Sequence, residues 1–470
     1  MIKPLKTSFI NKDTIVALAT PQGIGAIGII RVTGPNALPI CNQLFATKSL
    51  KKINLDKKAS HTVHFGVIHD GDVILDEVLL TLFKAPTSYT AEDTIEISCH
   101  GSGFIQQHII QLIVKTGARM AQPGEFTLRA FLNGKLDLSQ AEAVADLISS
   151  NSSTSHQIAI EQMRGGFSSK IKLLRQNLID FASLIELELD FSEEDVEFAD
   201  RSDLKNLVNA IHRILQRLID SFEVGNVIKN GIPVAIVGKP NAGKSTLLNV
   251  LLEEDRAIVS EIAGTTRDVI EDEITIDGVL FRFIDTAGIR ETTDIIESIG
   301  VEKTFQQIKL SSFAIYLFDA HEITPSELQP IVDELVPHLH NSHLLLVANK
   351  IDKEDIDYIK KEFAAFPDML FISAKERIHI DELKQQLVAL FDSKTVNVTE
   401  TIVTNARHVE ALRHTNVALQ RVLDGLNTGV TGDFLAMDIR QALHYLGTIT
   451  GEISTDDLLS NIFSRFCIGK

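Results

Sequence analysis

Cysteine is scarce in this chain, with only Cys41, Cys99 and Cys467 among 470 residues. Their spacing matches no metal-ligand pattern, so we expect a reduced, cytoplasmic protein. No stretch resembles a signal peptide or an apolar run of roughly 18 residues, so we expect no membrane partner. The formal net charge of −18 argues against a non-specific nucleic-acid coat, although residues 1–70 carry nine Lys or Arg against three Asp.

The length predicts about two to four domains. Residues 1–125 are rich in short apolar runs bounded by Gly, Pro and Asp, which is typical of strands, and one helix is expected over Phe104–Val114. The expected strands are Thr14–Ala19, Ile27–Val32, Val63–Ile68, Val73–Phe83 and Thr94–Ser98. From about residue 138 the apolar period becomes helical, and helical period returns near the C-terminus.

The patterns together predict a multidomain α/β and α protein. We expect an N-terminal α+β domain over residues 1–125 and a helical bundle domain formed by residues 126–225 and 391–470. An α/β domain over residues 226–390 would be inserted into the helical domain, because helical patterns lie on both sides of it. Ser454 and Asp457 resemble a capping box that begins the last helix.

Residues Gly238 to Ser245 read G-K-P-N-A-G-K-S, the pattern of a phosphate-binding loop. The apolar run Ile232–Val237 precedes this loop and a helix-like stretch follows it, as the motif requires. Backbone N–H groups and the helix N-terminus would hold the β- and γ-phosphates of a nucleotide. Lys244 would neutralise phosphate charge, and the Ser245 hydroxyl would ligate Mg²⁺.

Three further motifs follow in order, each after an apolar run. They are Asp285-Thr286-Ala287-Gly288, then Asn349-Lys350-Ile351-Asp352, then Ser373-Ala374-Lys375. Asp285 would hold Mg²⁺ through water, and the Gly288 N–H would reach the γ-phosphate. A buried Asp352 would accept two hydrogen bonds from the guanine edge and reject adenine, which lacks that donor pair. The four motifs predict a P-loop GTPase domain of the Ras-like class.

The catalytic apparatus for hydrolysis is less evident. Ile289 occupies the position where many small GTPases carry a water-orienting Gln, so a polar residue farther along must serve. The candidates are Arg290, Glu291, Asp294 and Glu297. A counter-charge could come from a partner's arginine or from a monovalent cation, for which Asn241 offers a side-chain carbonyl; Asn241 could equally stabilise the turn. Thr266 is the expected switch residue over Mg²⁺.

A second glycine-rich pattern, Gly23 to Gly28, matches the dinucleotide-binding fingerprint G-x-G-x-x-G. The true fingerprint opens a helix, whereas Gly28 here runs into the strand-like residues I-I-R-V. We therefore expect a turn between strands and no dinucleotide.

Several motifs carry a resemblance to a known family. The run G-T-T-R-D from Gly264, Asn241 in the phosphate loop and Ile289 after D-T-A-G resemble the potassium-activated GTPases related to translation factors. The N-terminal part carries D-T-I-V-A, P-G-E-F and A-F-L-N-G-K-L-D-L, and the chain ends C-I-G-K at Cys467 to Lys470. Over essentially its whole length the sequence resembles the MnmE (TrmE) family of tRNA uridine-5-carboxymethylaminomethyl modification GTPases.

The resemblance implies an N-terminal domain that folds like folate-binding aminomethyltransferase domains, forms a homodimer and binds 5-formyltetrahydrofolate or a related folate as one-carbon donor. The implied folate contacts are Arg31, Glu96, Lys135 and Lys470. Basic side chains can meet the folate glutamate carboxylates, and Glu96 can meet N–H donors of the pterin. Without the resemblance, these four residues are more typical of surface salt bridges.

The resemblance also implies roles in the GTPase domain. GTP would contact Asn241, Ala242, Gly243, Lys244, Ser245, Thr246, Ser260, Glu261, Ile262, Ala263, Gly264, Thr265, Thr266, Asp285, Thr286, Ala287, Gly288, Asn349, Lys350, Asp352, Ser373, Ala374 and Lys375. K⁺ would be held by Asn241, Ser260, Thr265 and the backbone carbonyl of Ile262. Mg²⁺ would be held by Ser245 and Thr266, and Glu297 would orient the attacking water indirectly, given its distance from Gly288.

The implied partners are tRNA and the FAD-binding protein MnmG, in a heterotetramer. Together they would add an aminomethyl or carboxymethylaminomethyl group at wobble uridine 34 of certain tRNAs. GTPase domains of the family meet across the nucleotide in the GTP state, and hydrolysis gates the modification.

Cys467 admits three interpretations. Prenylation of a terminal Cys box is possible in principle, but Gly469-Lys470 is a poor ending for it. A buried small hydrophobe is the ordinary role of a free Cys. The resemblance favours a functional thiol near the folate, acting on the C5–C6 bond of uridine.

Two other functions compete. A ribosome-assembly GTPase without modification chemistry would carry a KH-like or S1-like RNA module, and the sequence shows no G-x-x-G loop in a KH context. A folate-dependent aminomethyl carrier with a vestigial switch would not need intact Lys244, Thr266, Asp285 and Asp352.

Overall fold

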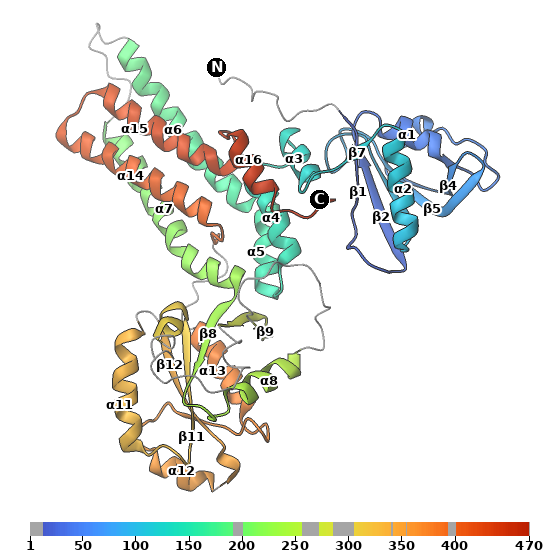
Figure 1. Cartoon of the computed structure of the whole chain (residues 1–470). Helices are drawn as coiled ribbons and strands as arrows, with labels where there is room; N and C mark the ends of the chain where they lie inside the picture. Colours follow the sequence, from blue (N-terminus) through green and yellow to red (C-terminus); the bar gives the residue numbers. More distant parts are fainter. Residues whose placement is uncertain are drawn as a thin grey trace. The chain divides into compact units, whose positions relative to one another are not determined.

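The computed structural model describes residues 13–190, 201–255, 272–284, 305–339, 342–353, 355–392 and 401–469. The chain divides into two compact units (Figure 1). The first unit consists of Met1–Ala145, Gln162–Arg201 and Arg421–Lys470, and the second of Asp146–Glu161 and Ser202–Gln420. Each unit is thus assembled from segments that lie far apart in the sequence.

A seven-stranded sheet forms the N-terminal part of the first unit, with the order β3-β4-β5-β6-β2-β1-β7. The strands are β1 (Ile15–Leu18), β2 (Ile27–Thr33), β3 (Phe45–Ala46), β4 (Thr62–Asp70), β5 (Val73–Phe83), β6 (Thr94–His100) and β7 (Arg119–Met120). Neighbouring strands are antiparallel except β1 and β7. The five expected strands are confirmed, with some ends shifted by one or two residues.

Alternation along these strands buries one face of the sheet. Ile30 and Ile97 are fully buried and share a core cluster with α1 (Ala37–Leu44) and α2 (Gly103–Lys115). The opposite face leaves large apolar side chains in solvent: the cross-strand pair Phe65 and Leu79 is 54% and 46% exposed.

The Gly23–Gly28 segment is a turn between strands, as expected. It connects β1 to β2, which pair antiparallel. Gly25 N–H donates to the Gly101 carbonyl at 3.1 Å, and Gly101 N–H donates to the Ala26 carbonyl at 3.2 Å. A Cβ on Gly101 would come within 2.2 Å of the Gly25 carbonyl oxygen, so this close approach requires glycine.

Helices complete the first unit. They are α3 (Glu125–Leu132), most of α4 (Leu138–Ser149), α6 (Gly166–Asp190), α15 (Gly432–Thr450) and α16 (Asp456–Phe463). α6 and α15 pack along each other, and Arg440 on α15 pairs with Glu186 on α6 at 2.7 Å. No helix in the described ranges is long and apolar enough to cross a membrane.

The expected capping box at Ser454 is wrong by one residue. The N-cap of α16 is Thr455, whose Oγ1 accepts a hydrogen bond from the Leu458 N–H at 3.3 Å. Because Leu458 then occupies the third helical position, no acidic side chain can complete a capping box.

The second unit contains a six-stranded sheet with the order β13-β12-β11-β8-β10-β9. The strands are β8 (Ile232–Val237), β9 (Asp272–Ile276), β10 (Val279–Phe283), β11 (Phe313–Asp319), β12 (His343–Asn349) and β13 (Leu370–Phe371). Only β9 and β10 pair antiparallel; the other pairs are parallel. The described helices of this unit are α5 (Ser153–Met163), α7 (Arg201–Asn230), α8 (Lys244–Asp255), α11 (Pro325–Leu335), α12 (Ile356–Glu362), α13 (Ile380–Asp392) and α14 (Ala406–Thr428), some of which extend beyond its limits.

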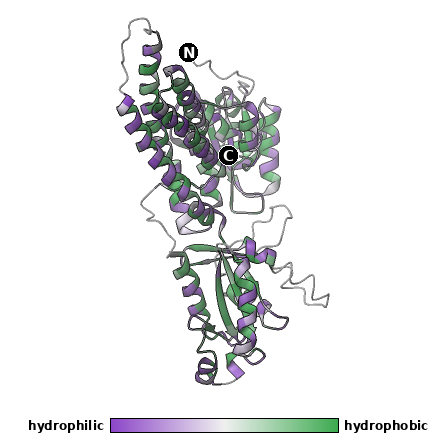
Figure 2. Cartoon of the chain, turned by 90° about the vertical axis from the view of Figure 1, so that its left-hand side faces the viewer, coloured by the Kyte–Doolittle hydropathy of each residue, from purple (hydrophilic) through white to green (hydrophobic). Residues whose placement is uncertain are grey.

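Both faces of this sheet are covered, so its central strands are apolar along their length (Figure 2). Ile315 and Leu317 of β11 lie in one core cluster with Leu247 of α8. Tyr316 and Phe318 lie in a second cluster on the other face. This arrangement is the three-layer α/β fold that the nucleotide motifs predict.

The connection between α4 and α5 lies against the β9–β10 hairpin. Thr275 of β9 donates from Oγ1 to the Asn151 carbonyl at 3.3 Å, and Thr154 donates to the carbonyl of Gly278 in the hairpin turn at 3.5 Å. Lys229, near the end of α7, pairs with Asp146 at 2.8 Å. These contacts fix the strands that lead from the expected switch Thr266 to Asp285.

Candidate functional site: a phosphate loop, a base-recognition loop and a terminal tail

The phosphate loop lies between the end of β8 and the start of α8, which confirms the strand–loop–helix context. Two of its glycines cannot be replaced without a clash. A Cβ on Gly238 would lie 2.0 Å from the Leu317 carbonyl oxygen, and one on Gly243 would lie 2.2 Å from Asn349 Nδ2. Both have positive φ, as does Asn241 at 64°. The loop therefore has the tight, glycine-dependent backbone that is typical of a phosphate cradle.

Lys244 lies within this cradle. Its Nζ donates to the carbonyls of Gly238 and Lys239 at 2.7 and 2.8 Å. Burial lowers the pKa of Lys244 from its ordinary value. Ser245 is half-buried in the first turn of α8, whereas Thr246 is exposed. The position of Ser245 beside the loop suits a Mg²⁺ ligand, and Lys244 suits phosphate oxygens.

Asn349 connects three of the predicted motifs. Its Nδ2 donates to the Ala242 carbonyl in the phosphate loop at 2.8 Å, and its Oδ1 accepts from the Ala374 N–H at 3.0 Å. The side chain is 2% exposed. The structure thus brings the phosphate loop, the N-K-x-D segment and the S-A-K segment together, as the sequence predicts.

Asp352 receives a hydrogen bond from Ser373 Oγ at 2.5 Å. This hydrogen bond is the main cause that lowers the pKa of Asp352, so the carboxyl is ionised at neutral pH and acts only as an acceptor. The expectation of a buried carboxylate is wrong for the protein alone, because Asp352 is exposed at the edge of the sheet. Lys375 is also exposed, and a hydrogen bond to Glu376 raises its pKa.

Asp319 is a residue that the sequence analysis did not identify. It ends β11, is 2% exposed, and pairs with Lys350 at 2.7 Å. The available signal is an acidic residue directly after the apolar run F-A-I-Y-L-F, similar to Asp285 after its own run.

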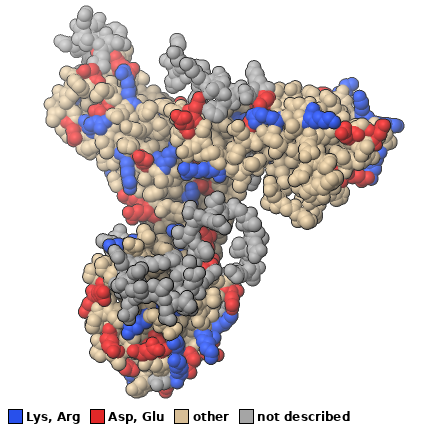
Figure 3. Space-filling view, in the orientation of Figure 1, with Lys and Arg blue, Asp and Glu red and all other residues tan. Residues whose placement is uncertain are grey.

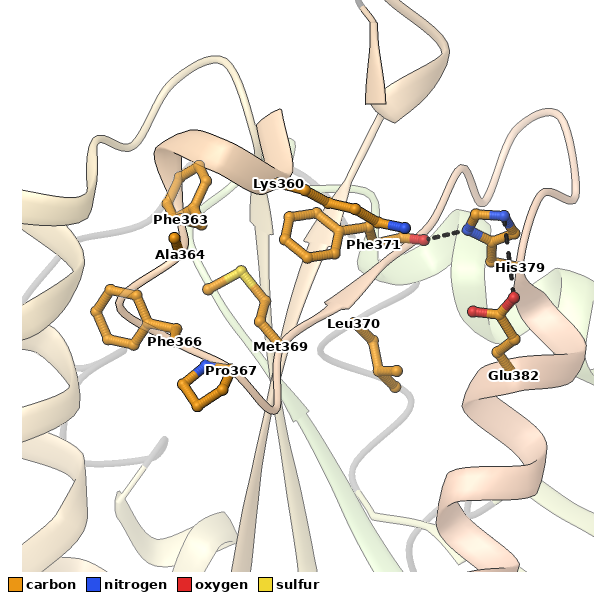
Figure 4. A pocket seen from close by; sticks show the side chains of 10 residues that line it. All are labelled: Lys360, Phe363, Ala364, Phe366, Pro367, Met369, Leu370, Phe371, His379 and Glu382. Atoms are coloured by element: carbon orange, nitrogen blue, oxygen red, sulfur yellow. Dashed lines mark hydrogen bonds and ion pairs between the residues drawn. The ribbon is translucent and has the colours of Figure 1, made fainter. Parts of the chain in front are cut away.

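A pocket of about 290 Å³ lies beside the edge strand β13. Figure 4 shows Phe363, Phe366 and Met369 on its apolar side, and His379 and Glu382 at the other end. His379 donates from Nδ1 to the Phe371 carbonyl at 2.9 Å. The pocket contains none of the predicted site residues, but His379 secures the turn after Ser373 that carries the S-A-K segment.

Arg31 and Glu96, two of the implied folate contacts, form an ion pair in the first unit. They are direct neighbours on β2 and β6. Glu96 Oε1 lies 2.9 Å from Arg31 Nε and 2.8 Å from Nη2. The guanidinium carbon lies over the rings of Tyr89 and Phe126, at 5.5 and 5.6 Å from their centroids. Sequence reasoning did not identify these two aromatic residues.

The C-terminal tail reaches the same place. Arg31 Nη1 donates to the Gly469 carbonyl at 3.2 Å, and the Gly124 N–H donates to the Cys467 carbonyl at 3.3 Å. Phe466 packs with Phe463 at a centroid distance of 5.3 Å, and Phe463 packs with Phe131 at 6.4 Å. These contacts fix the tail while the Cys467 side chain stays exposed, so the interpretation as a buried hydrophobe is wrong.

Lys135 is exposed beyond α3, and among the described residues its side chain forms no hydrogen bond with Arg31, Glu96 or the tail. Other predicted site residues lie outside the described ranges. They are Ser260, Glu261, Ile262, Ala263, Gly264, Thr265, Thr266, Asp285, Thr286, Ala287, Gly288, Glu297 and Lys470.

Comparison with known proteins relates both units to one family. The model for the GTP-binding protein TrmE N-terminus matches residues 14–135, and that for the MnmE helical domain matches residues 138–467. Proteins described as tRNA modification GTPase MnmE are 57% identical in Cytophaga hutchinsonii, over 98% of this chain and 98% of that protein, and 57% identical in Flavobacterium psychrophilum, over 98% and 100%. The Bacteroides fragilis protein of that description is 53% identical over 98% and 100%.

Among solved structures, that of Era with MgGDPNP and nucleotides 1506–1542 of 16S ribosomal RNA is 30% identical over 40% of this chain and 66% of that chain, with a TM-score of 0.26. The relatives, by contrast, match 98% of this chain. The chain therefore belongs to the MnmE (TrmE) family of GTPases.

Proposed function

We propose that this GTPase is a tRNA modification enzyme that works with an FAD-dependent partner, MnmG. The pair adds a carboxymethylaminomethyl or aminomethyl group at C5 of wobble uridine 34 of certain tRNAs. A tetrahydrofolate supplies the one-carbon unit, and GTP hydrolysis gates the reaction. The curated relatives named tRNA modification GTPase support the substrate class.

The observation that carries the proposal is the meeting of Arg31, Glu96 and the C-terminal tail. A carboxylate held by an Arg beside aromatic rings offers what the pterin end of a folate needs: an acceptor for its N–H groups and apolar ring faces. Cys467 is exposed on the tail that Arg31 holds. The thiol can therefore approach a uridine bound beside the folate. The role that we assign to it is to act on the C5–C6 bond of that uridine.

In the GTPase domain, Lys244 and the backbone of the phosphate loop would hold the β- and γ-phosphates. Ser245 and Thr266 would hold Mg²⁺, and Asn241, Ser260, Ile262 and Thr265 would hold K⁺. Bound metal ions neutralise charge that develops on the phosphate oxygens. Asn241 is exposed at the mouth of the loop, so its side-chain carbonyl is accessible to a cation, and Glu297 would orient the water.

A homodimer is part of this proposal. The open face of the N-terminal sheet exposes Ile27, Val63, Phe65 and Leu79, with exposures of 64%, 59%, 54% and 46%. A monomer gains nothing from leaving such side chains in water, whereas a second copy would bury them. We also propose that GTPase domains of two copies meet across the nucleotide when K⁺ and GTP are bound.

The surface charge favours a partner that shares the RNA contact. On the face shown in Figure 3, Lys and Arg side chains of the described residues alternate with Asp and Glu. A net charge of −18 also opposes binding to a polyanion by this chain alone. We therefore assign part of the tRNA contact to the FAD-binding partner, in a cytoplasmic heterotetramer.

We also propose the domain division stated above, with boundaries near residues 125, 225 and 390. The family models for the N-terminal domain, which ends at residue 135, and for the helical domain, which begins at residue 138, support the first boundary to within about ten residues.

The decisive experiment is mass spectrometry of wobble nucleosides from cells that lack this chain. Complementation with the intact protein should restore the modified uridine. Cys467→Ser should keep GTP hydrolysis but lose the modification. Undiminished modification with Cys467→Ser would contradict the catalytic role of the thiol. Normally modified wobble nucleosides in cells without the chain would contradict the proposed function itself.

A further inference from the structure

A buried carboxylate lies directly behind the base-recognition loop. Asp319 is the last residue of β11, and its register partner on the adjacent parallel strand β12 is Asn349. The side chain is 1% exposed. Its Oδ2 lies 2.7 Å from Lys350 Nζ, and its Oδ1 accepts the His321 N–H at 3.0 Å.

A carboxylate at this depth is costly unless it is paired and hydrogen-bonded. Burial by itself would raise the pKa of Asp319, but the hydrogen bond from Lys350 and the His321 N–H lower it below the ordinary value. Lys353 lies farther away, at 3.5 Å, and its side chain is 53% exposed, so solvent screens its contribution. Lys350 is thus the main counter-ion that keeps Asp319 ionised.

Lys350 is held through its side chain and its carbonyl. Besides the ion pair to Asp319, its carbonyl lies 3.1 Å from His321 Nε2, which donates because a carbonyl can only accept, and it also accepts the Lys353 N–H at 3.3 Å. The backbone of Lys350 has φ of 67°, in the left-handed region that a residue with a side chain rarely occupies. Such a conformation persists only when surrounding contacts determine it. Asp319, which ends β11, and His321 just beyond it supply two of those contacts, and the N–H groups of Ile351 and Lys353 supply backbone hydrogen bonds beside them.

The chain direction at Lys350 sets the place of Asp352. Lys350 is followed by Ile351, which is 4% exposed, and by Asp352 in the short 3₁₀ turn Ile351–Lys353. A change in the backbone of Lys350 would therefore move the Asp352 carboxylate relative to Ser373 and to the base.

We propose that Asp319 is a positioning residue for guanine recognition: it fixes Lys350 and, through the left-handed backbone there, the carboxylate of Asp352. This inference rests on the role of Asp352 as the acceptor for the guanine edge. Asp319 contacts no nucleotide itself. Loss of the Asp319 carboxylate should lower both the affinity for the guanine base and the selectivity for it, while the phosphate loop stays intact.

The test compares GTP with ITP, whose base lacks the 2-amino group and so forms one hydrogen bond fewer with Asp352. In the full-length protein carrying Asp319→Asn, we expect the dissociation constant for GTP to rise about tenfold, the equivalent of one hydrogen bond to a charged group. The constant for ITP should rise less, so the preference for GTP over ITP should fall about threefold or more. The value of kcat at saturating GTP should stay near that of the unchanged protein, because the phosphate loop is not altered.

Glu327→Gln is the matched control. Glu327, like Asp319, is a hydrogen-bonded carboxylate, but both of its hydrogen bonds come from Thr324 at the start of α11. This variant should leave the GTP to ITP ratio unchanged. If Asp319 had only a structural role, Asp319→Asn would lower the active fraction or the melting temperature and leave the ratio as it is, and that result would overturn the proposal.

Two further variants keep the test decisive. Should Asp319→Asn fail to fold, Asp319→Glu retains the charge but moves the carboxylate by one methylene, and the same loss of the ratio is expected. A double-mutant cycle with Lys350→Met should be strongly non-additive, since Asp319 acts through Lys350. Additive losses of GTP affinity in that cycle would contradict the proposal that Asp319 acts through Lys350.

Discussion

The guanidinium of Arg31 donates a hydrogen bond from Nη1 to the carbonyl oxygen of Gly469 over 3.2 Å. This contact links strand β2 with a tail that is 438 residues farther along the chain. The tail also passes close to β1: Gly469 has φ of 96°, and a Cβ added to it would lie 2.3 Å from the Leu18 carbonyl oxygen. The tail that carries the exposed thiol of Cys467 is thereby held against Arg31.

Gly469→Ala should displace this tail. A Cβ there would come within 2.3 Å of the Leu18 carbonyl oxygen, and the backbone atom cannot move aside. We expect wobble modification to fall about tenfold, from roughly 1–3 kcal/mol of strain, while GTP hydrolysis is kept. Nucleoside mass spectrometry and a GTPase assay measure the two activities.

Gly71→Ala is the control for that substitution. Gly71 also has positive φ, at 60°, but no heavy atom lies within 4 Å of its Cβ position. It therefore carries the backbone strain without the clash. Equal wobble modification by the two variants would mean that the close approach of Gly469 to β1 is not needed for the modification.

The nucleotide motifs could be predicted from the sequence because each is local. Ile232–Val237 is an apolar run followed at once by a glycine-rich loop, and the same logic applies to Asn349 after its strand. No local pattern relates Arg31 to Gly469, since their contact depends on where the last helix ends. Asp319 was missed for a different reason: a single Asp after a strand is typical of ordinary strand ends, and only its burial distinguishes it.

Asp352→Asn should change the nucleotide preference from GTP towards XTP. The carboxylate accepts two hydrogen bonds from guanine, whereas the Asn amide has one acceptor and one donor edge, which suits the 2-oxo group of xanthine. We expect GTP affinity to fall about a hundredfold or more, from the loss of charge-assisted hydrogen bonds, and XTP affinity to rise. Calorimetric titration with GTP, XTP and ATP measures this; equal binding of ATP and GTP by the unchanged protein would contradict the role of Asp352.

Asn241 should determine how the GTPase responds to monovalent cations. We expect K⁺ to accelerate hydrolysis more than Na⁺, and Asn241→Ala to remove most of this difference, because the side-chain carbonyl is lost as a ligand. The residue has φ of 64°, so alanine also adds backbone strain. Asn241→Gly removes the carbonyl without that strain. If the glycine variant kept the K⁺ response, Asn241 would only stabilise the turn. Equal hydrolysis rates in K⁺ and Na⁺ for the unchanged protein would contradict the proposed cation site.

Glu125 should make the first unit sensitive to acid. Arg119 Nη2 and Arg129 Nη2 lie 2.6 and 3.0 Å from its Oε1, and its side chain is 10% exposed. Burial by itself would raise the pKa of Glu125, but the hydrogen bonds from Arg119, the Gln122 N–H and Arg129 lower it below the ordinary value. The stabilisation is therefore complete above the unfolded-state pKa of about 4.3 and is lost as pH falls through the lower folded-state value.

Glu125→Gln should lower the free energy of unfolding at pH 7 by roughly 1–3 kcal/mol, because Arg119 and Arg129 lose one buried counter-ion while both still pair with Asp13. The same change should flatten the pH dependence below about pH 4, where Glu125 would otherwise take up a proton. Thermal unfolding scans at pH 7 and under acid conditions measure both effects. Glu77→Gln is the control, since Glu77 pairs with Lys48 while both side chains are largely exposed, at 48% and 58%. An exposed pair of this kind contributes about 0–1 kcal/mol, so equal shifts for the two variants would show that burial of the Glu125 network has no effect on stability.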